Sequence, residues 1–322
     1  MIRFSIVIPA YNAARVLKRC LKAIAAIDYP DFETILVDDG STDDTAAVVR
    51  QYPAVQYIRQ DNQGPAAARN KGAAASSGEL IFFTDADCVP PPDILSRYAS
   101  FFMNGDLAGL GGGYRTRNIE SPVARYVGRE IQFRHQLARP GRTKAFGTYN
   151  CVFKKDIFLS AGGFDTGFKH ASGEDFDFCY RLVAAGYRLG FDPDIFVYHD
   201  HPDKIMKYLK QQYKRGTTRT RNIFRHGKTA VADNYVEKGV KWQPPLLAGV
   251  ILGAGLALFH PLAGLALALA CSGLLLLSNL SFYRFVSRAE PGLLPLTLLM
   301  TFLRPAAWSL GIIKYFFVPR QR

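Results

Sequence analysis

Two carboxylates, Asp85 and Asp87, follow directly after the apolar residues 80–83. A short apolar run closed by a turn is typical of a strand buried in a parallel sheet, and ligands of such sheets bind beyond the carboxyl ends of the strands. Two carboxylates at that place repel each other and lose hydration, so we expect a cation between them. Mg²⁺ or Mn²⁺ carrying a phosphate fits best, because these ions take few carboxylates and complete their coordination with substrate oxygens. The alternative is a solvated Asp-x-Asp turn.

A second acidic group, Glu174, Asp175 and Asp177, stands at the start of a helix predicted at 176–185. Acids in a first helical turn are ordinary partners of the helix dipole. The functional interpretation is that one of these carboxylates acts as a general base on a hydroxyl group. The sequence leaves both interpretations open at this point.

The elements that position these acids alternate between strands and helices. The patterning predicts strands at 4–8, 34–37, 55–59 and 80–83, with helices at 13–27, 44–51 and 66–75. Alternation at this spacing predicts βαβ units, and therefore an α/β fold with a mostly parallel central sheet flanked by helices.

Polar residues end the other predicted strands as well. A carboxylate at a strand end can accept a hydrogen bond from a base or a ribose, and the turn after the first strand offers a face for a base. The third helix begins at a glycine, and the positive N-terminal end of this helix favours an anion. The plainer alternative is a helix cap and a surface arginine. The candidate nucleotide-binding residues are Pro9, Tyr11, Asp38, Asp39, Gly64, Arg69 and Asp85.

Four stretches together carry a family resemblance: IVIPAYN at 6–12, VDDGSTD at 37–43, NQGPAAARNKG at 62–72 and DAD at 85–87. Their order and spacing resemble family 2 glycosyltransferases of the GT-A fold, over roughly the first two thirds of the chain. The resemblance implies a metal-dependent, inverting transfer from a nucleotide-diphosphate sugar, with a UDP-sugar as the default donor. It implies that Asp39, with Asp38 nearby, reads the base, that Asp85 contacts the ribose and that Asp87 holds the metal.

The same resemblance assigns roles further along the chain. It places the general base at Asp175, with Glu174 in support. His199 ends a predicted strand and could complete the metal site or donate to a diphosphate, the alternative being a structural or surface histidine. Gln212 and Arg215 match a Gln-x-x-Arg-Trp motif of processive family members and are candidates for binding diphosphate or acceptor. Gly216 stands where that motif has tryptophan, so we expect transfer of a single sugar.

The chain is strongly basic, with a formal net charge of +13 over 322 residues. Such a charge favours an anionic partner: nucleotide phosphates, a lipid surface or nucleic acid. Lysines and arginines gather at residues 204–228, but no recognition element for nucleic acid accompanies them, so we expect no nucleic-acid partner. The five cysteines lack paired spacing, and we expect reduced thiols.

The region 244–322 is predicted to contact a membrane, after a catalytic domain at 1–235. Residues 246–260 and 262–280 are almost uncharged and are predicted as two spans forming a hairpin, the alternative being buried helices of a soluble core. Residues 293–318 are predicted to be broken or re-entrant, because Arg304-Pro305 interrupts the apolar run. The basic stretch before the first span predicts a multi-pass inner-membrane protein whose catalytic domain faces the cytoplasm.

The sequence therefore predicts a glycosyltransferase that moves one sugar to a lipid-linked or envelope-glycan acceptor at the membrane. Three alternatives remain open. A nucleotidyltransferase would use the same metal site but would have no use for a base at Asp175. A processive polysaccharide synthase is a variant within the same class. A non-catalytic membrane protein would keep the nucleotide-binding fold without turnover.

Overall fold

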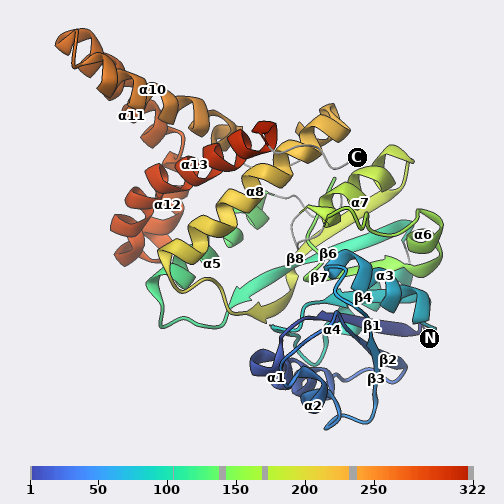
Figure 1. The fold of residues 1–322 in the computed structure, drawn as a ribbon. Coiled ribbons are helices and arrows are strands. Elements are labelled where there is room, and N and C mark those ends of the chain that lie inside the picture. Colours follow the sequence, from blue (N-terminus) through green and yellow to red (C-terminus); the bar gives the residue numbers. More distant parts are fainter. Residues whose placement is uncertain (1, 104, 138–142, 169–172, 232–237, 318–322) are drawn as a thin grey trace. The chain divides into compact units, whose positions relative to one another are not determined.

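The computed structural model describes residues 2–103, 105–137, 143–168, 173–231 and 238–317. The chain forms two compact units, which are described one at a time (Figure 1). The first consists of Met1–Arg117, Ala138–Asp200 and His226–Asp233, and the second of Asn118–Leu137, His201–Arg225 and Asn234–Arg322. The first unit is smaller than the predicted catalytic domain, because two stretches of that domain pack with the C-terminal helices instead.

An eight-stranded sheet organises the first unit, with the strand order β3-β2-β1-β4-β7-β6-β8-β5. Strands β3, β2, β1 and β4 are successive parallel neighbours, as are β6 and β8, whereas β7 and β5 run antiparallel to their neighbours. The predicted α/β fold with a mostly parallel sheet is confirmed. The strands are Phe4–Ala10 (β1), Phe32–Asp38 (β2), Val55–Arg59 (β3), Leu80–Thr84 (β4), Cys88–Val89 (β5), Leu107–Thr116 (β6), Asn150–Lys154 (β7) and Arg188–His199 (β8).

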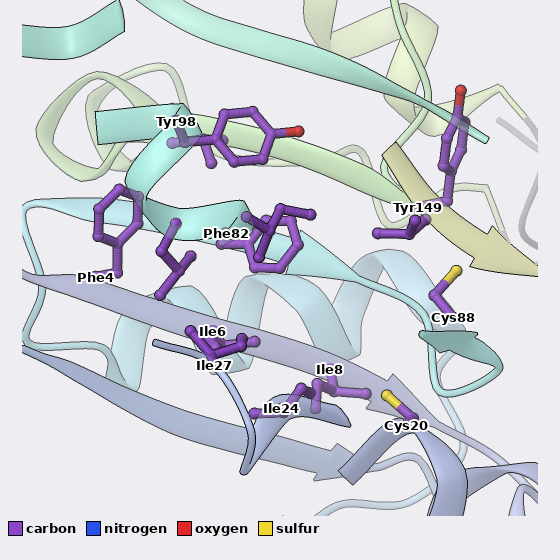
Figure 2. Packing of buried hydrophobic residues seen from close by; sticks show 14 of the residues in the cluster. Phe4, Ile6, Ile8, Cys20, Ile24, Ile27, Phe82, Cys88, Tyr98 and Tyr149 are labelled. Atoms are coloured by element: carbon purple, nitrogen blue, oxygen red, sulfur yellow. The ribbon is translucent and has the colours of Figure 1, made fainter. Parts of the chain in front are cut away.

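Helices cover both faces of this sheet, because successive side chains of its central strands point to opposite faces. Ile6 and Ile8 of β1 belong to the same buried cluster as Ile24 of α1, as Figure 2 shows. Val7 faces the other way and contacts α3, where Gly72 leaves room for it: a Cβ there would lie 2.4 Å from Val7 Cγ1. The helices of this unit are Ala14–Ile24 (α1), Thr45–Val49 (α2), Pro65–Ala75 (α3), Ile94–Met103 (α4), Lys155–Ser160 (α6), Glu174–Ala184 (α7) and Lys228–Val231 (α9).

The second unit is helical. Two of its helices, α8 and α13, approach so closely that glycines are needed at the contact: a Cβ on Gly216 would lie 2.5 Å from the carbonyl oxygen of Trp308, and one on Gly311 would lie 2.1 Å from that of Tyr213. The helices are Pro122–Leu137 (α5), Ile205–His226 (α8), Gln243–Leu256 (α10), Pro261–Leu277 (α11), Leu280–Ala289 (α12) and Leu294–Phe317 (α13), with short 3₁₀ turns at Lys238–Trp242 and Pro291–Leu293.

The prediction that residues 293–318 are broken at Arg304-Pro305 is wrong, because α13 continues through Pro305 as one helix. The charge of Arg304 is not isolated: its Nη1 donates to Glu130 Oε1 at 2.9 Å. Pro305 is buried, and packing against neighbouring helices lets a helix tolerate an interior proline. Both expected interruptions are therefore compensated by partners far away in the sequence.

The predicted hairpin is present as α10 and α11, but its helices are short. They contain 14 and 17 residues, which at about 1.5 Å per residue is less than the roughly 30 Å of a bilayer core. Among the described residues, one stretch, Pro291–Phe317, is long and apolar enough to cross a membrane. A second exists only if α11 and α12, which meet at a bend of 51°, count as one span.

Candidate active site

Asp87 and His199 meet where two neighbouring strands pair, since Cys88 of β5 lies opposite His199 of β8. Asp87 Oδ2 lies 3.2 Å from His199 Nε2. Burial lowers the pKa of His199, but the hydrogen bond to Asp87 and the charges of Asp87 and Asp85 outweigh it, so the pKa is raised. The structure thus brings together the two side chains that the sequence predicted as metal ligands.

The residues around Asp87 suit a divalent cation. Ligand atoms of Asp85, Asp87 and Cys88 lie within 4.8 Å of one another. Burial, reinforced by the charges of Asp87 and Asp85, raises the pKa of the Cys88 thiol well above its usual value, so the sulfur stays protonated and is a poor ligand. Carboxylate oxygens and imidazole are better ligands for Mn²⁺ or Mg²⁺. The carboxylates of Asp85 and Asp87 are therefore the better ligands of this group, and His199 lies next to Asp87; that Asp87 and His199 hold a metal and that Asp85 contacts the ribose stay predictions.

Arg69 joins the two acidic groups of the sequence. Its Nη2 donates to Asp85 Oδ1 at 2.7 Å, and its Nη1 donates to Glu174 Oε1 at 2.8 Å. The side chains of Arg69 and Glu174 are each 2% exposed, whereas that of Asp85 is 32% exposed. We predicted that Arg69 contacts the nucleotide; the structure gives it two carboxylate partners, and contact with a nucleotide stays a prediction.

Asp175, the predicted base, is half-buried beside Glu174 in the first turn of α7. Burial, together with the charge of Glu174, raises the pKa of Asp175 to about 7. A carboxyl group that titrates near neutrality is well matched to removing a proton from a hydroxyl. Asp177, in contrast to Asp175, is fully buried, and its carboxylate pairs with Arg181 Nε at 3.0 Å and with His226 Nε2 at 2.8 Å.

Asp38 and Asp39 are buried, and their carboxylates accept hydrogen bonds from the protein itself. Asp39 accepts from the backbone N–H groups of Gln63 at 2.9 Å and Gly64 at 2.8 Å. Asp38 accepts from the Tyr57 hydroxyl at 2.5 Å. These contacts fix the loop after β2 and the start of α3, where Gly64 has a φ of +94°. That Asp38 and Asp39 read a base stays a prediction.

Pro9, near the end of β1, and Tyr11, in the turn that follows, are the predicted face for the base, and Tyr11 is 54% exposed. Sequence reasoning gave no role to Asn12, which holds this turn against the next one. Its Oδ1 accepts from the backbone N–H of Thr42 at 2.8 Å and from that of Asp43 at 3.3 Å. A signal was present, because asparagine is one of the few residues that tolerate a positive φ, here 48°.

Gln212 and Arg215 lie on α8 in the second unit, so they are described with that unit and not with the carboxylate cluster. Gln212 is 1% exposed and Arg215 is half-buried. Sequence reasoning missed two neighbours of theirs, Glu130 of α5 and Arg304 of α13, which form a buried ion pair. No local pattern could reveal it, because the two residues are 174 positions apart.

Residues 5–160 match the family model described as glycosyl transferase family 2. Glycosyltransferase AglE of Haloferax volcanii is 30% identical over 223 residues, which cover 66% of this chain and 71% of AglE. The pre-mycofactocin glycosyltransferase of Mycobacterium tuberculosis is 28% identical over 235 residues, covering 69% of this chain and 48% of that protein. The chain therefore spans about half the length of the second relative.

Two solved structures are similar in fold. The mannosyltransferase PcManGT from Pyrobaculum calidifontis, in complex with GDP-Man and Mn²⁺, superposes with a TM-score of 0.64 at 21% identity, over 98% of this chain and 87% of PcManGT. Residues 1–349 of S. aureus TarS, in complex with UDP-GlcNAc, superpose with a TM-score of 0.50 at 16% identity, over 99% of this chain and 93% of that TarS chain. At these identities the likeness concerns the fold alone.

Proposed function

The chain belongs to glycosyltransferase family 2, and we propose that it transfers a single sugar, with inversion, from a nucleotide-diphosphate sugar to an acceptor hydroxyl. The family match and the relative AglE support glycosyltransferase activity, and the likeness to PcManGT supports the GT-A-like α/β fold. The donor, the acceptor, the stereochemistry and the metal are the proposal.

One observation carries the mechanism: Arg69 contacts both Asp85 and Glu174, at 2.7 and 2.8 Å. It thereby links Asp85, one of the carboxylates proposed for the metal, to the helical turn that carries Asp175. An inverting transfer needs a base on one side of the anomeric carbon and a stabilised leaving group on the other. The Arg69 contacts with Asp85 and Glu174 support this reaction over simple nucleotide binding.

In the proposed reaction, Asp175 accepts the proton of the acceptor hydroxyl as its oxygen forms a bond to the anomeric carbon. The bond between that carbon and the diphosphate breaks, and its electron pair leaves with the nucleoside diphosphate. Asp85, Asp87 and His199 would hold a divalent cation, which when bound neutralises the departing diphosphate. Glu174 supports Asp175 by anchoring the first turn of α7 to Arg69.

We expect Asp87→Asn to weaken Mn²⁺ binding by about tenfold or more, because it removes one charged ligand from the site. Titration of the purified protein with Mn²⁺, followed by electron paramagnetic resonance of the free ion, measures this directly. Asp43→Asn, in a neighbouring loop, is the matched control. Equal Mn²⁺ affinities of Asp87→Asn and the unsubstituted protein would place the metal elsewhere or rule out metal dependence.

We propose a UDP-sugar as donor. One structural relative contains UDP-GlcNAc and another contains GDP-Man with Mn²⁺, so the test must include both bases. A panel of nucleotide sugars, with Mn²⁺, Mg²⁺ or a chelator, identifies the donor by release of the nucleoside diphosphate. Release of pyrophosphate instead would identify a nucleotidyltransferase.

Gly216 supports transfer of one sugar over processive synthesis. A tryptophan side chain at this position, as in the processive motif, would meet the backbone of Trp308, because even a Cβ would lie 2.5 Å from its carbonyl oxygen. The α8–α13 contact therefore excludes that motif in this arrangement. Product analysis by mass spectrometry tests this point, since chains of several sugars would contradict it.

We further propose that the acceptor is a lipid-linked sugar or envelope glycan at the cytoplasmic face of the inner membrane, with the C-terminal helices in the bilayer. The length and composition of α13 support this, and so does the tip of the α10–α11 hairpin, where Leu258, Phe259 and Leu262 are each at least 80% exposed. The basic residues of α8, together with the exposed Arg284 and Arg288, favour the cytoplasmic side for the unit that precedes them. Protease accessibility in oriented membrane vesicles tests the orientation.

Leu262→Asp should reduce binding to lipid vesicles several-fold, because a charge at the hairpin tip opposes insertion. Flotation of the full chain with phosphatidylcholine vesicles measures the bound fraction. Met103→Asp is the control, since Met103 is also exposed, at 71%, but lies on α4 of the first unit. If the two variants float equally well, the hairpin tip does not enter the bilayer.

A further inference from the structure

A small cavity lies inside the second unit. Its volume is about 30 Å³, which is room for roughly two or three water molecules, or for one small oxyanion of similar bulk. Side chains from α5, α8, α12, α13 and the segments next to them line it: Glu130, Phe133, Arg134, Gln212, Val240, Asn279, Phe282, Arg304 and Trp308. Phe133, Arg134 and Trp308 are only half-buried, so the cavity is not enclosed by fully buried groups alone.

Part of the lining is fully satisfied by internal contacts. Glu130 accepts from Arg304 Nη1 at 2.9 Å on one oxygen and from the Tyr208 hydroxyl at 2.8 Å on the other. The second amino group of Arg304 donates to Gln243 Oε1 at 2.7 Å and to Asn279 Oδ1 at 3.3 Å. These groups form a rigid wall and need no ligand.

Other buried atoms at the cavity have no hydrogen-bond partner among the described residues, and they are all donors. Gln212 Nε2 and Trp308 Nε1 line the cavity, and Arg215 Nη1 follows one turn along α8 from Gln212. Gln212 is 99% buried, being 1% exposed. A buried donor without an acceptor is unfavourable, so an acceptor at this place would stabilise the unit.

The charges around the cavity also favour an anionic ligand. Burial raises the pKa of Glu130, but the charges of Arg134, Arg304 and Arg215 outweigh it and lower the pKa to about 2. Glu130 is therefore ionised at neutral pH, and the guanidinium group of Arg304, 2.9 Å away, already compensates its charge. Arg215, whose Nη1 has no hydrogen-bond partner among the described residues, adds a further positive charge near Glu130.

From these donors and this charge we propose that the cavity is an oxyanion site that takes the phosphate group of the lipid-linked acceptor. The assignment of the phosphate to the acceptor rests on the proposed function. The helix α13, whose length and composition suit a membrane, carries both Arg304 and Trp308, and Phe133, Val240 and Phe282 add apolar wall. A phosphate next to an apolar surface is the chemistry of a lipid headgroup, although free phosphate offers the same oxygens.

Binding is tested without nucleotide sugar or metal, using the full chain in detergent or added to vesicles. Inorganic phosphate at constant ionic strength should raise the thermal unfolding temperature more than chloride does. Vesicles containing phosphatidic acid, a phosphate monoester lipid, should bind more protein than pure phosphatidylcholine vesicles do. If inorganic phosphate stabilises the protein but vesicles with phosphatidic acid bind no more protein than those without it, the proposal that the phosphate belongs to a lipid is overturned.

Gln212→Glu places a carboxylate where the oxyanion would lie and should weaken phosphatidic acid binding about tenfold, a change of about 1.4 kcal/mol. Gln136→Glu is the matched control, because it adds the same charge at an exposed position of α5. Trp308→Phe, which removes one donor and keeps an aromatic ring, should give a smaller loss. If Gln212→Glu binds phosphatidic acid as well as Gln136→Glu does, the site is occupied by water only and the proposal is overturned.

This test and the test of sugar transfer fail separately. Loss of anion binding in Gln212→Glu requires no catalysis, and the Asp87 measurements do not involve the second unit. If nucleotide sugars are hydrolysed while phosphatidic acid is ignored, the proposed function stands and the oxyanion site does not. If phosphatidic acid binds while no nucleotide sugar reacts, the oxyanion site stands and the proposed sugar transfer does not.

Discussion

Asp175→Asn is expected to lower kcat for sugar transfer about a thousandfold, because the amide cannot accept the proton of the acceptor hydroxyl. The affinities for donor and Mn²⁺ should change little, since Asp175 belongs to neither donor set in the proposed mechanism. Initial rates of nucleoside diphosphate release, together with donor binding by calorimetry, separate the two effects. The exposed Asp156→Asn on α6 serves as control.

The pH dependence of the unsubstituted enzyme follows from the same residue. Since the pKa of Asp175 is raised to about 7, kcat/KM should rise as the pH increases through 7 and level off above it. Asp175→Asn should abolish that rise along with most of the rate. A variant that keeps the full rate, or a profile without a rise near neutrality, would place the base elsewhere in the acidic cluster.

The raised pKa also has a consequence for stability. Between about pH 4 and pH 7 the native Asp175 carboxyl binds a proton that the unfolded chain has released, so the free energy of unfolding falls as the pH rises. Asp175→Asn removes this dependence and should stabilise the protein at pH 8 by about 2 kcal/mol, less than a fully buried carboxyl would give. Denaturant unfolding at pH 5 and pH 8 measures the difference.

The largest loss of stability is expected for Arg69→Met. It removes the Arg69 contact from the buried Glu174 and from Asp85, and breaking a buried ion pair in this way typically costs about 3–5 kcal/mol. Denaturant unfolding of the variant gives the value. The exposed Lys71→Met, two residues along α3, is the matched control and should change stability by less than about 0.5 kcal/mol.

A double substitution distinguishes the charge effect from loss of packing. Adding Glu174→Gln to Arg69→Met removes the buried charge that has lost its Arg69 contact and should recover part of the lost stability, which gives a coupling free energy between the two sites. Absence of any coupling would mean that Arg69 acts through its bulk alone. In that case the argument that Arg69 orients the two acidic groups would fail.

The sequence predicted best what depends on neighbouring residues. The alternation of strands and helices determines the parallel half of the sheet, and the acids after residues 80–83 lie at a strand end as expected. Contacts between distant residues were beyond such reasoning. Arg69 was assigned to a nucleotide from its place on α3, because nothing local indicates Glu174, 105 positions away.

The error at residues 293–318 has the same origin. Arg304 and Pro305 interrupt an apolar run when the run is considered alone, and a break is then the expected result. In the structure Glu130, Gln243 and Asn279 accept from Arg304. A buried charge with several partners does not interrupt a helix in the way an isolated one does.

The glycines between α8 and α13 bear on how this enzyme could change during evolution. A tryptophan at position 216 would restore the processive motif in the sequence, but the backbone of Trp308 fills the space where its side chain would begin. Gly311 lies equally close to the backbone of Tyr213. We expect Gly216→Trp to force the two helices apart instead of creating a polymerising enzyme. A tryptophan at position 216 would therefore be accommodated only together with further substitutions on both helices, because each glycine lies against the backbone of the other helix.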